Sequence, residues 1–157
     1  MLVCLVALWA TMPLAAQHIV HNETGDQDQI NGRLSAKVLQ ATEQYGELMQ
    51  LTDFTIEVKF NTAPVGWLAW VDTTVVNNDV KYALIVFDLR ALEKYKLEVD
   101  YHRVVIHELL HVRTVFLRGM ILDAQGLAPV DRLRMLHILH DFVSTFAWAA
   151  VWPEPRK

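Results

Sequence analysis

The chain has 157 residues and a formal net charge of −4, which suits a single globular domain with a sizeable core. Apolar residues make up 53% of the chain and charged residues 20%, so bulk disorder is excluded. The acidic balance gives no electrostatic footprint for nucleic acid, and we expect no nucleic-acid partner. Cys4 is the single cysteine, which excludes an intramolecular disulfide and a cysteine-ligated metal site.

Residues 1–16 are almost wholly apolar and are similar to the core of a secretory signal, with Ala15 and Ala16 before a candidate cleavage point. No Lys or Arg precedes this run, as a signal would require, so a buried helix or a misassigned start codon explains the apolar segment equally well. We expect a secreted or periplasmic protein if the segment is a signal, and a cytoplasmic one otherwise. The run is too short to span a membrane comfortably, and no stable membrane insertion is expected.

Residues 28–152 are predicted to form a single domain. Apolar residues recur at helical spacing from about Gln29 to Leu51, which predicts a long amphipathic helix. Residues 54–60 alternate strictly between apolar and polar, which is typical of a half-buried strand. Two further strands are predicted at 66–76 and 80–87, and the Asn-Asn-Asp turn between them indicates a hairpin.

The rest of the domain is predicted to be helical. A short helix at 89–96 leads to a longer one at 101–117, which Asp100 can cap and whose apolar circumference predicts burial. After a Gly- and Pro-containing break, Asp131 is expected to cap a last helix from Arg132 to Trp152. This order predicts an α+β domain, with helices segregated on one side of a small, mostly antiparallel sheet.

The stretch from His107 to His111 reads His-Glu-Leu-Leu-His and matches the H-E-x-x-H pattern of zinc-dependent hydrolases. Residues four apart lie on one face of a helix, so both imidazoles can reach one metal ion. Glu108 lies on the flank of that face, where its carboxylate can act as general base on a metal-activated water. The pattern also occurs by chance on exposed helices. A buried helix, however, needs a partner for three ionisable residues, and Zn²⁺ is the simplest.

Catalytic zinc usually has three protein ligands, so a third is expected farther along the chain. The closing helix offers His137, His140 and Asp141, spaced three and four residues apart on one face. We expect His140 to be a ligand, with Asp141 as the alternative ligand or as a group that orients a histidine. His137 is the third candidate. A solvated polar stripe on an amphipathic helix is the other interpretation of these residues.

Together, the element order and the pentapeptide resemble the zincin metallopeptidases, and more narrowly the small minimal zincins of bacterial and phage genomes. The resemblance implies His107 and His111 as ligands, Glu108 as general base, and a peptide or protein substrate that pairs with the strand nearest the cleft. The metzincin extension is absent, because Thr114 and Leu117 stand where Gly and His are required. Gluzincins take a Glu from the following helix as third ligand, which His or Asp would have to replace here.

A competing hypothesis is a metal-stabilised, non-catalytic interaction or scaffold module with a zincin-like fold. A closed site with four protein ligands would favour this module, whereas a catalytic site keeps one position for water. The sequence predicts no oligomeric state.

Overall fold

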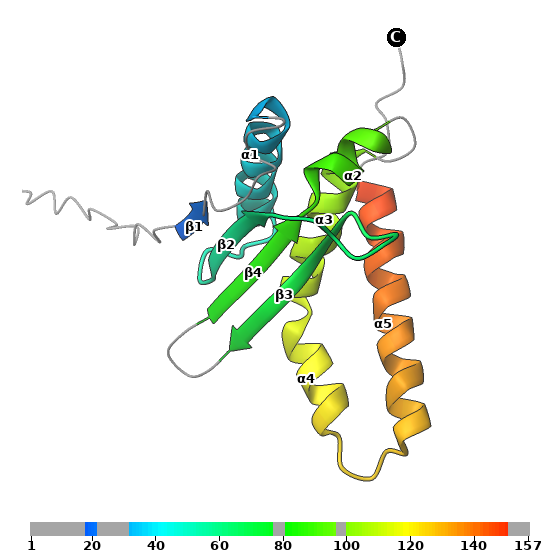
Figure 1. The fold of residues 1–157 in the computed structure, drawn as a ribbon. Helices are drawn as coiled ribbons and strands as arrows, with labels where there is room; N and C mark the ends of the chain where they lie inside the picture. The colour runs from blue at the N-terminus through cyan, green and yellow to red at the C-terminus, as the bar shows by residue number, and fades with distance from the viewer. Residues whose placement is uncertain (1–17, 22–31, 77–80, 97–99, 151–157) are drawn as a thin grey trace, which may run out of the picture.

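The computed structural model describes residues 18–21, 32–76, 81–96 and 100–150 (Figure 1). The elements in chain order are β1 (His18–His21), α1 (Gly32–Leu48), β2 (Thr55–Phe60), β3 (Ala69–Val76), β4 (Lys81–Phe87), α2 (Leu89–Lys94), α3 (Tyr101–Arg113), α4 (Val115–Asp123) and α5 (Pro129–Ala150). The apolar segment 1–16 and the hairpin turn at 77–79 lie outside the described residues. No helix within the described ranges combines the length and the apolar character that crossing a membrane requires.

The four strands form one mixed sheet in the order β1-β2-β4-β3. β1 pairs with β2 and β2 with β4 in parallel, whereas β3 and β4 form the predicted antiparallel hairpin. The α+β class is therefore confirmed, but the expectation of a mostly antiparallel sheet is wrong. One reason is that β3 lies at the edge of the sheet, so that its hairpin partner β4 is the strand that pairs with β2, in parallel. The other is that β1, which also pairs in parallel, comes from a segment that was not predicted to be a strand.

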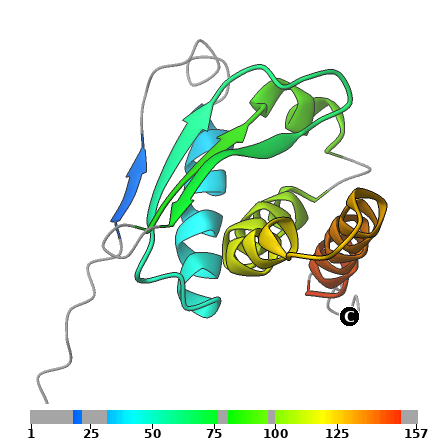
Figure 2. The same cartoon turned by 90° about the horizontal axis from the view of Figure 1, so that it is seen from below.

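Helices α1 and α3 cover one face of this sheet, and α5 packs against α3 on the same side (Figure 2). The alternation predicted for β2 is confirmed, since Ile56, Val58 and Phe60 are buried and their neighbours are not. β4 is buried along most of its length, as expected for a central strand. Val105 and Leu109 bring the motif helix into the same core, so α3 is the buried helix that its sequence predicted.

The observed ends of α3 and α5 agree with the sequence predictions in one case and differ from them in two. Asp100 caps α3 as predicted, because its carboxylate accepts a hydrogen bond of 2.9 Å from the backbone N–H of His102. α3 ends at Arg113 rather than at 117; the Thr114 hydroxyl donates to the carbonyl of Leu110 at 2.8 Å, a bond that often bends helices. α5 begins at Pro129, which suits a first helical position, so Asp131 lies within the first turn and is not the cap.

Candidate metal centre

The two motif histidines of α3 face each other. The Nε2 atoms of His107 and His111 lie 3.0 Å apart. The centroids of the two rings are 4.7 Å apart and the ring planes cross at 80°. The helical spacing therefore brings the two imidazoles together as the pentapeptide predicts, and both side chains present a nitrogen to the same point.

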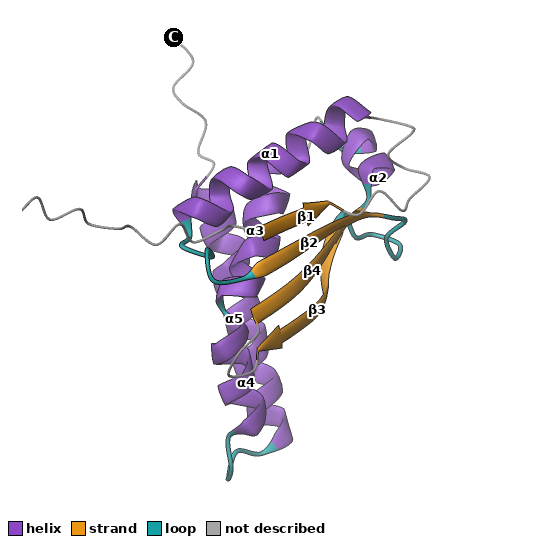
Figure 3. Cartoon of the chain, turned by 90° about the vertical axis from the view of Figure 1, so that its left-hand side faces the viewer, coloured by secondary structure: helices purple, strands orange, loops and turns teal. Residues whose placement is uncertain are grey.

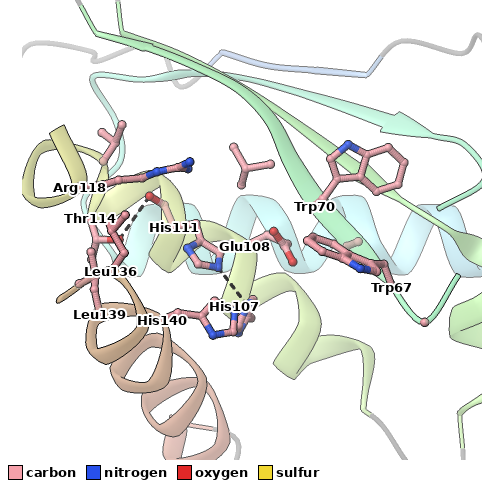
Figure 4. A pocket seen from close by; sticks show the side chains of 14 residues that line it. Trp67, Trp70, His107, Glu108, His111, Thr114, Arg118, Leu136, Leu139 and His140 are labelled. Atoms are coloured by element: carbon pink, nitrogen blue, oxygen red, sulfur yellow. Dashed lines mark hydrogen bonds between the residues drawn. The ribbon is translucent and has the colours of Figure 1, made fainter. Parts of the chain in front are cut away.

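His140 of α5 completes a group of three histidines. Its ring centroid lies 5.3 Å from that of His107 and 5.4 Å from that of His111. One ligand nitrogen from each of the three residues lies within 4.8 Å of the others. Figure 4 shows the three rings converging from two neighbouring helices.

Apolar packing between α3 and α5 holds this arrangement in place. Ile106 and Leu110, which flank the motif positions on α3, form a buried cluster with Val143 and Ala147 of α5. On α5, Val143 follows His140 by three residues, so the contact fixes the turn that presents the histidine.

The three imidazoles suit a tetrahedral ion. Zinc binds histidine nitrogen at about 2.0–2.1 Å, so two ligands of one tetrahedral zinc have nitrogens roughly 3.3 Å apart. The 3.0 Å between His107 and His111 is close to that value, and His140 is exposed, so its ring can rotate toward the pair. Three neutral imidazoles also suit copper, nickel or iron, so the donor set does not by itself select zinc.

The structure does not place Asp141 or His137 in this group, although both were predicted as possible ligands. Among the described residues, the group consists of His107, His111 and His140. Consecutive helical residues point about 100° apart, so Asp141 points away from the direction in which His140 reaches the pair. Both Asp141 and His137 are exposed on α5.

Burial keeps the paired histidines neutral. Desolvation, followed by the nearby His140, lowers the pKa of His107 from 6.5 to about 4. Desolvation also lowers the pKa of His111 to about 4, with further contributions from His107, His140 and Arg118. The neutral imidazole is the form that binds a metal ion, so at neutral pH protons do not compete for these nitrogens.

Glu108 is only 5% exposed and lies between α3 and the edge strand β3. Burial raises the pKa of its carboxyl group from 4.5 to about 8, and a hydrogen bond from the backbone N–H of Val71 partly opposes this shift. Without a cation nearby, the side chain therefore holds a proton at neutral pH. A carboxyl group with a pKa this close to neutrality can both accept and donate a proton.

These residues border a cavity of about 600 Å³, a volume typical of small-molecule and cofactor sites. Trp67 and Trp70 line one end, where β3 begins, and Arg118 of α4 lies at the other, with the histidines between them (Figure 4). Sequence reasoning missed all three. Arg118 follows His111 by seven residues, a helical repeat that could have pointed to it. The two tryptophans carry no such signal, because β3 reaches the site only through the tertiary fold.

Comparison of the chain with protein-family models, with curated proteins and with solved structures gives no match to any of them.

Proposed function

We propose that this chain is a zinc-dependent hydrolase that cleaves peptide bonds. The observation that carries the proposal is the convergence of His107, His111 and His140 in one cavity, with the buried carboxyl group of Glu108 beside them. The pentapeptide supplies two of the histidines and the carboxyl group. The third histidine comes from a helix that begins 18 residues after the pentapeptide ends.

The three histidines would hold the zinc ion. When bound, zinc lowers the pKa of a water molecule and polarises a substrate carbonyl. Glu108 has the position and pKa to take a proton at its carboxylate and pass it to the leaving amine. A hydrogen bond from the backbone N–H of Val71 reaches the same carboxyl group.

The described sheet supports an extended peptide as substrate. β3 pairs with β4 on one side only, and its other edge borders the cavity. An unpaired strand edge can bind a peptide through backbone hydrogen bonds, while side chains along it determine preference. Trp67 and Trp70 offer apolar surface to substrate side chains. Arg118 offers a positive charge that can stabilise a developing oxyanion.

The number of ligands favours a catalytic site over the scaffold alternative. A structural zinc site is closed by four protein ligands, whereas a catalytic one has three and keeps a position for water. The histidine group has three members within the described part of the chain. The cavity beside them gives a substrate access.

The experiment that tests the proposal is digestion of a defined peptide mixture by zinc-loaded protein, followed by mass spectrometry. We expect cleavage that a chelator abolishes and that added zinc restores. Protein that contains stoichiometric zinc and leaves every peptide intact would contradict the peptidase assignment and support the scaffold module.

A further inference from the structure

The hairpin of α4 and α5 carries most of the exposed large hydrophobic residues of the described molecule. Of the fourteen large hydrophobic residues that are exposed, eleven lie on these two helices. They are Phe116, Leu117, Met120, Leu122, Val130, Leu133, Met135, Ile138, Phe142, Phe146 and Trp148. α4 has no buried residue at all, and the hairpin extends well beyond the sheet (Figures 1 and 3). Contiguous apolar surface of this kind usually marks an interaction site.

Four of these residues form a continuous row that we call the α5 stripe: Met135, Ile138, Phe142 and Phe146. Their spacing of three, four and four residues places them on one side of the helix. They are between 42% and 61% exposed, and the rings of Phe142 and Phe146 lie 6.1 Å apart. The same spacing makes the seam between paired helices in bundles and coiled coils.

The α5 stripe is separate from the metal centre. At about 100° per residue, its side chains point roughly opposite to His140. The face of α5 that carries Val143 and Ala147 is already buried against α3. A partner on the stripe would therefore contact a different surface from the one that lines the cavity.

We propose that the α5 stripe binds a second copy of this chain, so that the two hairpins pack into a four-helix bundle. The eleven exposed large hydrophobic residues of α4 and α5 supply the apolar centre that such an interface needs. The commonest protein assembly is a twofold dimer, in which one patch pairs with itself.

The charges on the hairpin favour a second copy over a lipid surface. Its three arginines, at 118, 132 and 134, are balanced by three aspartates at 123, 131 and 141. Helices that lie on membranes carry an excess of Lys and Arg on the polar face, which this hairpin lacks. The two stripes are expected to pair antiparallel, because a parallel pair would set Arg134 against Arg134 and Asp141 against Asp141.

The first test is the mass of the full chain in solution. We expect a particle with twice the mass of the 18.0 kDa chain, which dissociates when both Ile138 and Phe142 are changed to Asp. Val65→Asp is the matched control, since Val65 is a fully exposed apolar residue outside the hairpin. Circular dichroism verifies that the variants are folded. A wild-type chain that stays monomeric across the concentration range would overturn the proposal, and so would a dimer that the double variant leaves intact.

Oxidation of the full-length Ile138→Cys variant identifies what covers the stripe. Disulfides form only between residues whose Cα atoms are within about 7 Å, so a bond between the introduced cysteines of two chains requires the stripes to meet near a twofold axis. We expect that intermolecular bond. An intramolecular bond between the introduced cysteine and the native Cys4 would show that the N-terminal segment covers the stripe, and would overturn the proposal. The proposal would also be overturned if the chain were a monomer that binds phosphatidylcholine vesicles and lost this binding when Ile138 and Phe142 were changed to Asp.

Discussion

The carboxyl group of Glu108 on α3 accepts a hydrogen bond from the backbone N–H of Val71 on β3. This bond joins the motif helix to the strand that borders the cavity, and the Glu108 side chain is buried. A general base works only within hydrogen-bond reach of the proton it moves, so a fixed orientation is an advantage. The edge strand that is expected to receive a peptide also positions the carboxyl group that would act on it.

Replacement of Glu108 by Gln removes the proton acceptor and retains the size of the side chain. We expect kcat to fall by about 10²–10⁴-fold, the usual contribution of acid–base catalysis, while zinc stays bound. The measurement is peptide cleavage together with zinc content on the same sample. Glu43→Gln is the matched control, since Glu43 is exposed on α1 away from the cavity. A Glu108→Gln enzyme as fast as the wild type would show that this carboxyl group is not the base.

Replacement of His140 by Ala removes the ligand that α5 would contribute to the proposed zinc site. Loss of groups that merely orient a ligand weakens metal binding by about 10–100-fold, so we expect a loss of more than about 100-fold here. His137→Ala and Asp141→Asn are the controls, because both residues lie on the same helix outside the histidine group. The measurement is zinc affinity by competition with a chromophoric chelator. If Asp141→Asn weakened binding as much as His140→Ala did, the ligand set would include the carboxylate.

Part of the site follows from the sequence because helical periodicity is local. The positions of His107, Glu108 and His111 relative to one another depend only on α3 being helical, and the Asp100 cap and the buried circumference both indicate a helix. His140 was harder to predict, because His137 and Asp141 on the same helix could also bind a metal ion. Only the packing of Val143 and Ala147 against α3 decides which turn of α5 faces the pair.

The sheet order was less predictable from sequence, because strand pairing is not local. The hairpin of β3 and β4 was correctly predicted from its turn and its apolar runs. The parallel pairing of β2 with β4 requires β3 to lie on the outer edge, and neither strand carries a local signal for that choice. The tryptophans at 67 and 70 were missed for the same reason, since the site includes them only once β3 lies at the edge.

The stability of the metal-free protein should depend on the Glu108 carboxyl group. Its pKa is about 8 in the folded chain and 4.5 as an ordinary value, so the folded state holds a proton that the unfolded state releases. This contribution to stability is complete below pH 4.5 and is lost as the pH rises through 8. Between about pH 6.5 and 8 the loss of this contribution lowers the free energy of unfolding by about 1.5 kcal/mol. Over the same interval His107 and His111, whose pKa is 6.5 ordinarily and about 4 in the folded chain, raise it by about 0.8 kcal/mol, so the net change is a fall of about 0.7 kcal/mol.

Chemical denaturation of the chelator-treated protein at these two pH values measures this change. In Glu108→Gln only the opposing histidine contribution remains, so the free energy of unfolding should rise by about 0.8 kcal/mol over the same interval. Equal pH dependence in the two proteins would assign the effect to other groups.

Replacement of Arg118 by Ala should slow peptide cleavage without loss of zinc. Removal of an oxyanion donor costs about 10²–10³-fold in kcat, and the exposed position of Arg118 places the expected loss at the lower end. The effect should appear in kcat, with KM little changed, because the charge acts on the transition state. Arg113→Ala is the control, since Arg113 is exposed at the end of α3 and does not line the cavity. An increase in KM alone would instead assign Arg118 to ground-state binding.

Zinc should stabilise the folded chain, because the three histidines converge only when α3 and α5 are packed together. Binding at about 100 times the dissociation constant adds about 2.7 kcal/mol to the free energy of unfolding, which raises Tm by roughly 5–10 °C for a chain of this size. Differential scanning fluorimetry with and without zinc measures the shift, and a chelator should reverse it. The double variant His107→Ala, His111→Ala should show no shift, whereas His137→Ala should behave like the wild type. A shift that persists in the double variant would mean that zinc binds elsewhere on the chain.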